Sequence, residues 1–378
     1  MDSGLEGVVA AETVLSHADG SRGILWVRGH TLDELVADFH YDGAIALLWE
    51  GFAGTGLTAS GIRAALGVGR EAAFARLGEW LDQAAGRPLI EGPRLALAGL
   101  PDDSTAAAII ATLPVAIAAL LRRRSGADPL PPDPSRGTTA DLLRMVHGPV
   151  HPAPVAAAMA EALDTYFTAV IDNGFNTSAF TARLIASSRA SLAAAALGAY
   201  CAFTGPLHGG APGPTLDMLD EAEASGDIAG WAERKLAAGE RLMGFGHRVF
   251  RGGDPRAEAL RAALQRLGES LGPGAGRLAF AAEVERTVAT AYARVKPGRA
   301  PLRPNVEINA ALLLDAVGLP RDAFTPVFAI GRSPGWLAHA MEQRKTGRLI
   351  RPSSAYIGPV PPERPTREQH LTGGEAPN

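Results

Sequence analysis

Apolar residues recur at intervals of three and four along most of the chain. The pattern runs from about residue 42 to 121, resumes near Thr139, and continues through 255–267 and 278–295. This spacing is typical of amphipathic or buried helices. Two more apolar helices are expected after Pro304. Because sustained alternation with a period of two is rare, the pattern predicts a mainly α protein.

The first fifty residues are the exception. Residues 24–27 (ILWV) follow a polar turn flanked by Gly20 and Gly23, which is typical of a short strand. A helical pattern begins at Leu32, and Thr31 is a suitable N-cap for it. We therefore expect a short N-terminal β segment before the helices.

Two uninterrupted apolar stretches indicate interior helices. Residues 105–121 are uncharged and precede Arg122, but seventeen residues are at the short limit for crossing a bilayer. The stretch is rich in alanine and contains Pro114, so the sequence favours a buried helix over a transmembrane one. Residues 192–202 are apolar on every face and are expected in the interior.

Composition narrows the class of protein. The 378 residues exceed the usual size of one core, so two domains are expected; 47% are hydrophobic and 20% charged, which fits a soluble globular protein. A net charge of −4 argues against nucleic-acid or anionic-membrane partners bound through bulk charge. One cysteine, Cys201, excludes intramolecular disulfides and a Cys-based zinc site. The first twelve residues lack the basic and apolar regions of a secretory signal, so we expect a cytoplasmic protein.

Two histidines stand in glycine-rich loops. His208 follows the apolar stretch 192–202 and precedes two glycines, where it has room to hydrogen-bond a substrate; a lone loop histidine is also commonly structural. His247 follows Gly-Phe-Gly and precedes Arg251 and Arg256, a combination typical of an anion site.

One acid and two further arginines are candidates for the same chemistry. Glu307 opens an apolar helix, where it is either a general base with a raised pKa or a first-turn acid favoured by the helix dipole. Arg332 and Arg351 follow apolar runs, and a desolvated arginine is well suited to pairing with a carboxylate.

Several short segments, taken in order, resemble the citrate synthase family. The resemblance runs from about residue 165 to 357, and the opening of the chain is also similar. The matching segments are 176–183 (NTSAFTAR), 205–211 (GPLHGGA), 244–250 (GFGHRVF), 254–256 (DPR), 304–307 (PNVE), 332–336 (RSPGW) and 351–353 (RPS). Several motifs in one order make chance similarity very improbable.

The resemblance implies a mainly α, citrate synthase-like two-domain fold. A large domain would comprise residues 1–211 and 318–378, including a polar C-terminal tail, and a small domain would be inserted at 212–317. Family members form homodimers or larger assemblies, and each active site borrows an arginine from its neighbour, here Arg351. The active site would lie in a cleft that closes when the small domain moves.

The resemblance also implies a transferase of the tricarboxylic acid cycle. It would condense acetyl-CoA with oxaloacetate, convert the acyl group to an alkyl group, and need no metal or permanently bound cofactor. The implied catalytic residues are His208, His247 and Glu307. The implied oxaloacetate-binding residues are Asn173, Arg256, Arg332 and Arg351. The implied coenzyme A contacts are Arg241, Met243, Gly244, Phe245, Gly246 and Arg251.

Two positions depart from the family pattern and leave alternatives open. The base is usually aspartate, whereas this chain has Glu307, and the oxaloacetate-binding histidine three residues before Asn176 is Asn173. Asn173 donates a hydrogen bond but carries no positive charge. Having asparagine in place of histidine therefore costs roughly 1.5–3 kcal/mol of oxaloacetate binding free energy. We therefore consider a citrate synthase, a 2-methylcitrate synthase or related condensing enzyme, and a non-catalytic paralogue that binds CoA or an organic acid.

Overall fold

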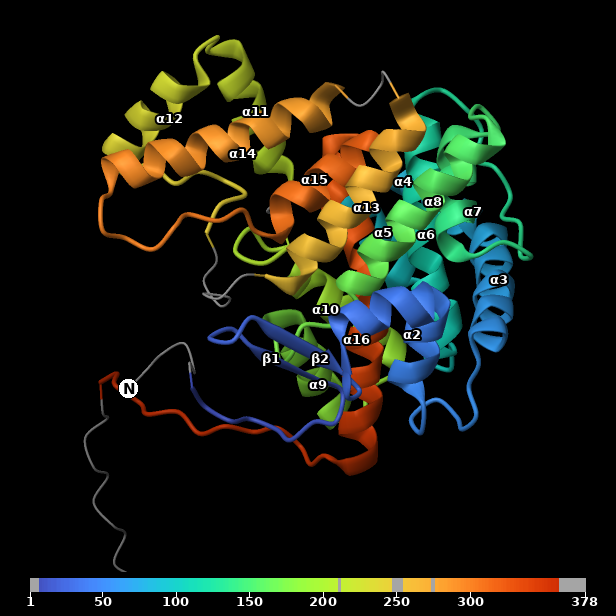
Figure 1. Ribbon diagram of the computed structural model, residues 1–378. Helices are drawn as coiled ribbons and strands as arrows, with labels where there is room; N and C mark the ends of the chain where they lie inside the picture. Colours follow the sequence, from blue (N-terminus) through green and yellow to red (C-terminus); the bar gives the residue numbers. More distant parts are fainter. Residues whose placement is uncertain (1–6, 210–211, 247–253, 273–275, 360–378) are drawn as a thin grey trace, which may run out of the picture.

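The computed structural model describes residues 7–209, 212–246, 254–272 and 276–359. It is mainly α-helical with one small three-stranded sheet near the N-terminus, which confirms the expected fold class. Figure 1 shows a body of packed helices, with a second group of helices at one end.

The N-terminal sheet is antiparallel in the order β1-β2-β3. Its strands are β1 (Ser16–Asp19), β2 (Ile24–Val27) and β3 (His30–Thr31), and Ser16 pairs with Val27. Thr31 ends the sheet and caps the next helix through a reciprocal capping box with Glu34, as its position predicted. The chain then passes through a π-helical turn, Leu35–Phe39, into the first long helix.

Most of the remaining helices form the body of the molecule. They are α1 (Leu32–Glu34), α2 (His40–Trp49), α3 (Ala59–Ala75), α4 (Leu81–Ala84), α5 (Gly92–Ala98), α6 (Ala106–Arg124), α7 (Thr138–His147), α8 (Ala153–Ala169), α9 (Thr177–Ser187), α10 (Leu192–Phe203) and α16 (Phe324–Thr346). The long helix α16 contacts α2, α6, α8, α9 and α10, so it runs through the centre of the body.

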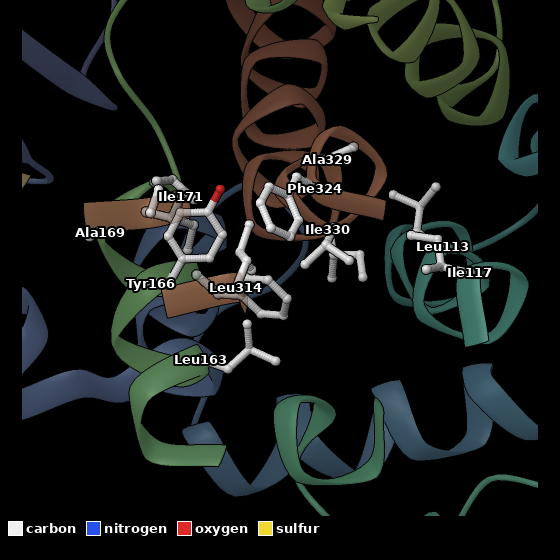
Figure 2. Close-up of a cluster of buried hydrophobic side chains, with 14 of the residues drawn as sticks. Leu113, Ile117, Leu163, Tyr166, Ala169, Ile171, Leu314, Phe324, Ala329 and Ile330 are labelled. Carbon is white, nitrogen blue, oxygen red and sulfur yellow. The ribbon is translucent and has the colours of Figure 1, made fainter. Parts of the chain in front are cut away.

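Helix α6 lies inside this body. Among the described residues it is the one helix long and apolar enough to cross a membrane, yet it packs between α3, α5, α7 and α16. Figure 2 shows Leu113 and Ile117 of α6 on one side of a buried cluster that includes Ile330 of α16 and Leu163 of α8. The observed burial supports the favoured interpretation of this stretch as a core helix.

The second group of helices comes from the segment after α10. Its members are α11 (Pro212–Ala224), α12 (Ile228–Ala237), α13 (Pro255–Leu271), α14 (Gly276–Val295) and α15 (Val306–Ala316). Helices α11, α12 and α14 gather at one end of the molecule (Figure 1), whereas α13 packs against α8 of the body. The division into domains at residues 212 and 317 stays a prediction.

Part of the apolar surface predicted to be interior is exposed in the single chain. On α10, Ala199 and Phe203 are buried, but Cys201 is exposed, so the expectation of burial on every face is correct for one side only. Leu184 of the neighbouring α9 is 42% exposed. After α16 the chain runs extended along the bottom of Figure 1, with the Ile357 side chain 97% exposed.

Candidate active site

His208 is held against the first turn of α9. Its Nε2 lies 2.8 Å from Ser178 Oγ and 3.3 Å from the Ser178 backbone nitrogen, and Trp336 Nε1 donates to the same Oγ at 2.9 Å. The Ser178 N–H cannot rotate away, whereas the Ser178 hydroxyl can reorient its hydrogen. A lone pair on Nε2 accepts from this N–H, and the positive end of the helix dipole favours it. The one hydroxyl hydrogen of Ser178 is shared between Nε2 and Asn176 Oδ1, which lies 2.8 Å from Oγ. The proton of the neutral ring is then assigned to Nδ1, which can donate to a ligand.

The electrostatic surroundings keep His208 neutral. Burial, reinforced by the charge of Arg332, lowers the pKa of His208 to about 4. At pH 7 the ring therefore acts as an uncharged hydrogen-bond donor. Such a donor stabilises negative charge that develops on a substrate oxygen.

Glu307 is positioned by the N-terminus of α15. Asn305 is the N-cap, and its side chain accepts from the Glu307 backbone N–H at 2.9 Å. The carboxylate is half-buried, and its Oε2 has no hydrogen-bond partner among the described residues. Burial raises the pKa of Glu307, although the charges of Arg241 and Arg256 lower it in part. A carboxylate that has lost its water without gaining donors is a stronger base than one in solvent.

The loop 241–246 packs against the start of α15. Asn305 ties the two together, because its N–H donates to the Gly244 carbonyl at 2.9 Å and its Nδ2 donates to the Gly246 carbonyl at 2.8 Å. Gly244 has a φ of +79°, and a Cβ there would lie 2.8 Å from Thr215 Cγ2. This close contact requires glycine at position 244. Because Asn305 is bonded to the loop at Gly244 and Gly246, the loop holds the backbone of α15 just before Glu307.

The predicted coenzyme A loop therefore has two kinds of residue. Phe245 is buried, and the Gly246 N–H already donates to the Arg303 carbonyl at 2.8 Å. The exposed Arg241 and the half-buried Met243 are the side chains of this described stretch that remain accessible. Contact with coenzyme A stays a prediction for all of them.

Arg256 is fixed by its own N-cap. Asp254 caps α13 and pairs with the guanidinium in bidentate fashion, with Nε–Oδ1 at 2.9 Å and Nη2–Oδ2 at 2.8 Å. Both side chains are buried. The plane of the Arg256 guanidinium is therefore set before any ligand binds.

Arg332 is buried in the middle of α16. Its Nε donates to the Val170 carbonyl at 2.5 Å, and its guanidinium carbon lies 5.1 Å from the centre of the Phe328 ring. Burial lowers the pKa of Arg332 to about 10, so the group stays charged at pH 7. Among the described residues, no hydrogen bond or ion pair engages the two terminal nitrogens of Arg332, which leaves them to bind a carboxylate.

Asn173 lies in the short loop between α8 and α9. Its Oδ1 is buried without a hydrogen-bond partner among the described residues. Its neighbours in the loop are held by Ser16, whose Oγ donates to Asp172 at 2.5 Å and accepts from the Gly174 N–H at 2.9 Å. The backbone around Asn173 is thus held in place, and the side-chain amide oxygen has no partner among the described residues.

Aromatic side chains connect the site residues that come from the body. The His208 ring lies 5.1 Å from Phe203, and Phe203 lies 4.7 Å from Phe328, which is the ring beneath Arg332. Arg332 is close enough to shift the pKa of His208, and Arg256 is close enough to shift the pKa of both Glu307 and Arg332. Four predicted site residues are therefore brought together: His208, Glu307, Arg256 and Arg332.

The family model "Citrate synthase, C-terminal domain" matches residues 4–353. The chain belongs to the citrate synthase family.

Individual relatives agree with this assignment. A protein described as "Putative citrate synthase 2" from Mycobacterium bovis is 37% identical, with 95% of this chain and 93% of the relative aligned. A "2-methylcitrate synthase" from Mycobacterium tuberculosis is 31% identical over 94% of this chain and 90% of that protein. The citrate synthase structure from Pyrobaculum aerophilum superposes with a TM-score of 0.82 at 26% identity, covering 96% of this chain and 94% of that one.

Arg351 is exposed on the extended segment after α16, so the expectation that it is desolvated does not hold within one chain. His247 and Arg251 lie outside the described residues. The role of each stays a prediction.

Several side chains that hold the candidate site in place were not predicted from the sequence. Asp254 and Asn305 could have been found, because each is an N-cap type that immediately precedes a predicted helix. Ser178 belongs to the segment 176–183 that resembles the family, but the sequence alone gave it no role. The buried Tyr166 of α8 gave no signal, because its significance depends on tertiary contacts.

Proposed function

We propose that the chain is a condensing enzyme of the citrate synthase type that joins acetyl-CoA to oxaloacetate. The observation that carries this proposal is the pairing in one site of a carboxylate with a raised pKa, Glu307, and a neutral imidazole, His208. Removing a proton from the carbon next to a thioester needs a base and a donor to the thioester oxygen at the same time. The enzyme is then a transferase that converts an acyl group to an alkyl group.

The first step forms the nucleophile. Glu307 takes a proton from the acetyl methyl group, and His208 Nδ1–H donates to the thioester oxygen as negative charge develops there. The methyl carbon then attacks the ketone carbon of oxaloacetate. We assign protonation of the ketone oxygen to His247 from the family resemblance. Water finally cleaves the thioester, giving citrate, free CoA and a proton.

Two buried arginines account for the choice of a dicarboxylate. Arg332 projects from α16 and Arg256 from α13, so each carboxylate of oxaloacetate has a cation from a different helix group. Closure of the small domain over the body would bring the groups together and exclude water. The coenzyme A thioester enters as a co-substrate, and no permanently bound cofactor is needed.

We further propose a homodimer with shared active sites. The partly exposed faces of α9 and α10 are apolar, as the exposed Leu184 illustrates. The extended segment 347–359 has exposed Tyr356 and Ile357 side chains beyond Arg351. An arm of this kind is suited to packing on a second copy, where Arg351 would enter the neighbouring site.

The test is release of free thiol from acetyl-CoA in the presence of oxaloacetate. We expect release with acetyl-CoA and identify the product by mass. The existence of a relative described as 2-methylcitrate synthase favours propionyl-CoA as the alternative donor, and a pocket discriminates one methylene by only about 1–3 kcal/mol. Faster release with propionyl-CoA would support that alternative. If the folded protein releases no thiol from either donor, the proposal is wrong and the non-catalytic paralogue is the remaining hypothesis.

Replacing Asn173 with His is expected to improve oxaloacetate binding. The buried Asn173 Oδ1 has no donor among the described residues, whereas a protonated histidine adds a charge-assisted hydrogen bond. We predict an oxaloacetate KM about tenfold lower, with the acetyl-CoA KM unchanged. Steady-state kinetics with each substrate varied in turn measure both. An unchanged oxaloacetate KM would mean that residue 173 does not contact this substrate.

A further inference from the structure

The Tyr166 hydroxyl is a buried polar group without a structural role among the described residues. Tyr166 lies near the end of α8 and is 1% exposed, and its hydroxyl has no hydrogen-bond partner among the described residues. Figure 2 shows the hydroxyl oxygen on the side of the Tyr166 ring that faces away from Leu163. Leaving a hydroxyl unpaired in the interior destabilises a protein, so its retention suggests a partner that binds.

The backbone places Tyr166 next to Arg332. The Val170 N–H donates to the Tyr166 carbonyl at 3.1 Å, and the Val170 carbonyl accepts from Arg332 Nε at 2.5 Å. The two side chains also share Phe328: the Tyr166 ring is 6.1 Å from its ring centre, and the Arg332 guanidinium is 5.1 Å from it. Tyr166 of α8 and Arg332 of α16 therefore both lie beside the C-terminal end of α8.

The surrounding charges agree with this placement. Burial raises the pKa of Tyr166, while Arg332 and Arg256 lower it and Glu307 raises it further. The hydroxyl is therefore near both arginines and the acid of the active site, and it stays protonated at pH 7. A protonated phenol can donate a hydrogen bond, and neither of the two neighbouring cations can accept it. An anionic ligand bound by these cations would supply the acceptor.

We propose that Tyr166 is a further substrate-binding residue, whose O–H donates to a carboxylate oxygen of the 2-oxo dicarboxylate held by Arg332 and Arg256. The assignment rests on the proposed function. The Tyr166 hydroxyl adds a directional, uncharged donor to the two cationic groups. Such a donor favours a ligand whose carboxylate oxygen lies in line with the O–H over an anion that is held by charge alone. The ligand would supply the acceptor that the free protein lacks.

The test is the Tyr166→Phe variant, which removes one oxygen. We expect the oxaloacetate KM to rise about tenfold or more, because a hydrogen bond to a charged group is lost. The acetyl-CoA KM should stay within about twofold. The Tm of the free protein should not fall, since the hydroxyl has no partner to lose, but the rise in Tm on adding oxaloacetate should shrink.

Tyr41→Phe is the matched control. Tyr41 is equally buried, but its hydroxyl donates to the Ile330 carbonyl at 2.8 Å. We expect this variant to lower the Tm and to leave the oxaloacetate KM unchanged. The inference would be overturned if the oxaloacetate KM of the Tyr166→Phe variant equals that of the natural chain, whether or not kcat is reduced. Absence of thiol release and of oxaloacetate binding by the natural chain would instead refute the proposed function and, with it, this assignment.

Discussion

The Glu307→Gln variant is expected to release CoA about a thousandfold more slowly than the natural chain, in line with the usual contribution of a general base. Glutamine keeps the size and the hydrogen bond from Glu307 N to Asn305, so α15 should fold as before. It cannot accept the methyl proton. Steady-state assays of thiol release measure the loss in kcat, and circular dichroism verifies the fold.

The Glu307→Asp variant tests whether reach or chemistry is limiting. Aspartate is a base, but it shortens the side chain by about 1 Å, and misplacement on this scale can cost about a hundredfold in rate. We expect an intermediate rate, slower than the natural chain and faster than Glu307→Gln. Equal rates for the Gln variant and the natural chain would show that Glu307 is not the base.

The same residue predicts the pH dependence of kcat/KM. A base must be deprotonated, so activity is present above the pKa of Glu307 and is lost as the pH falls through it. Because burial raises this pKa, the acid limb should lie above the ordinary range of glutamate. His208, with a pKa of about 4, stays neutral across that limb.

Mixing two impaired variants is expected to restore activity at low oxaloacetate concentration if the active sites are shared. Arg351→Ala alone should raise the oxaloacetate KM about ten- to hundredfold, because a charge-assisted pair to a carboxylate is lost. In a mixed dimer with Glu307→Gln, one site has both changes and the other has neither. Random pairing makes half of the dimers mixed, so about a quarter of the natural activity should return.

The control is each variant unfolded and refolded with itself, which should regain nothing. Mixed samples are prepared by joint refolding, and thiol release is measured at low oxaloacetate concentration. Activity that stays at the level of the separate variants would contradict sharing, and so would an Arg351→Ala variant with the natural KM.

Much of the fold could be predicted because it depends on local patterns. Thr31 ahead of Leu32 is a cap followed by a helical period, and both appear where expected. The stretch 105–121 was correctly interpreted as a core helix, since alanine and Pro114 weaken its resemblance to a membrane span. The partly exposed side of α10 could not be predicted, because an apolar face has the same sequence whether its own chain or a second copy covers it.

The candidate site was predictable to a smaller extent. His208 and Glu307 could be selected because glycine-rich loops and helix starts are visible in the sequence. The environment that tunes them was not visible: Ser178 reaches His208 across 30 positions of the sequence. Arg332 depends likewise on the carbonyl of Val170, and such pairings exist only after folding. Tyr166 belongs to the same class, since its unpartnered hydroxyl is a property of the packed helix end.

The most direct test of this mechanism is a crystal structure with oxaloacetate and carboxymethyl-CoA, an acetyl-CoA analogue whose carboxylate takes the place of the acetyl group. We predict that the Glu307 carboxyl group and His208 Nδ1 each lie within hydrogen-bond distance, about 2.6–3.2 Å, of that carboxylate. Arg332 and Arg256 should contact the bound dicarboxylate. A closed complex in which Glu307 and His208 do not both reach the analogue would contradict the mechanism.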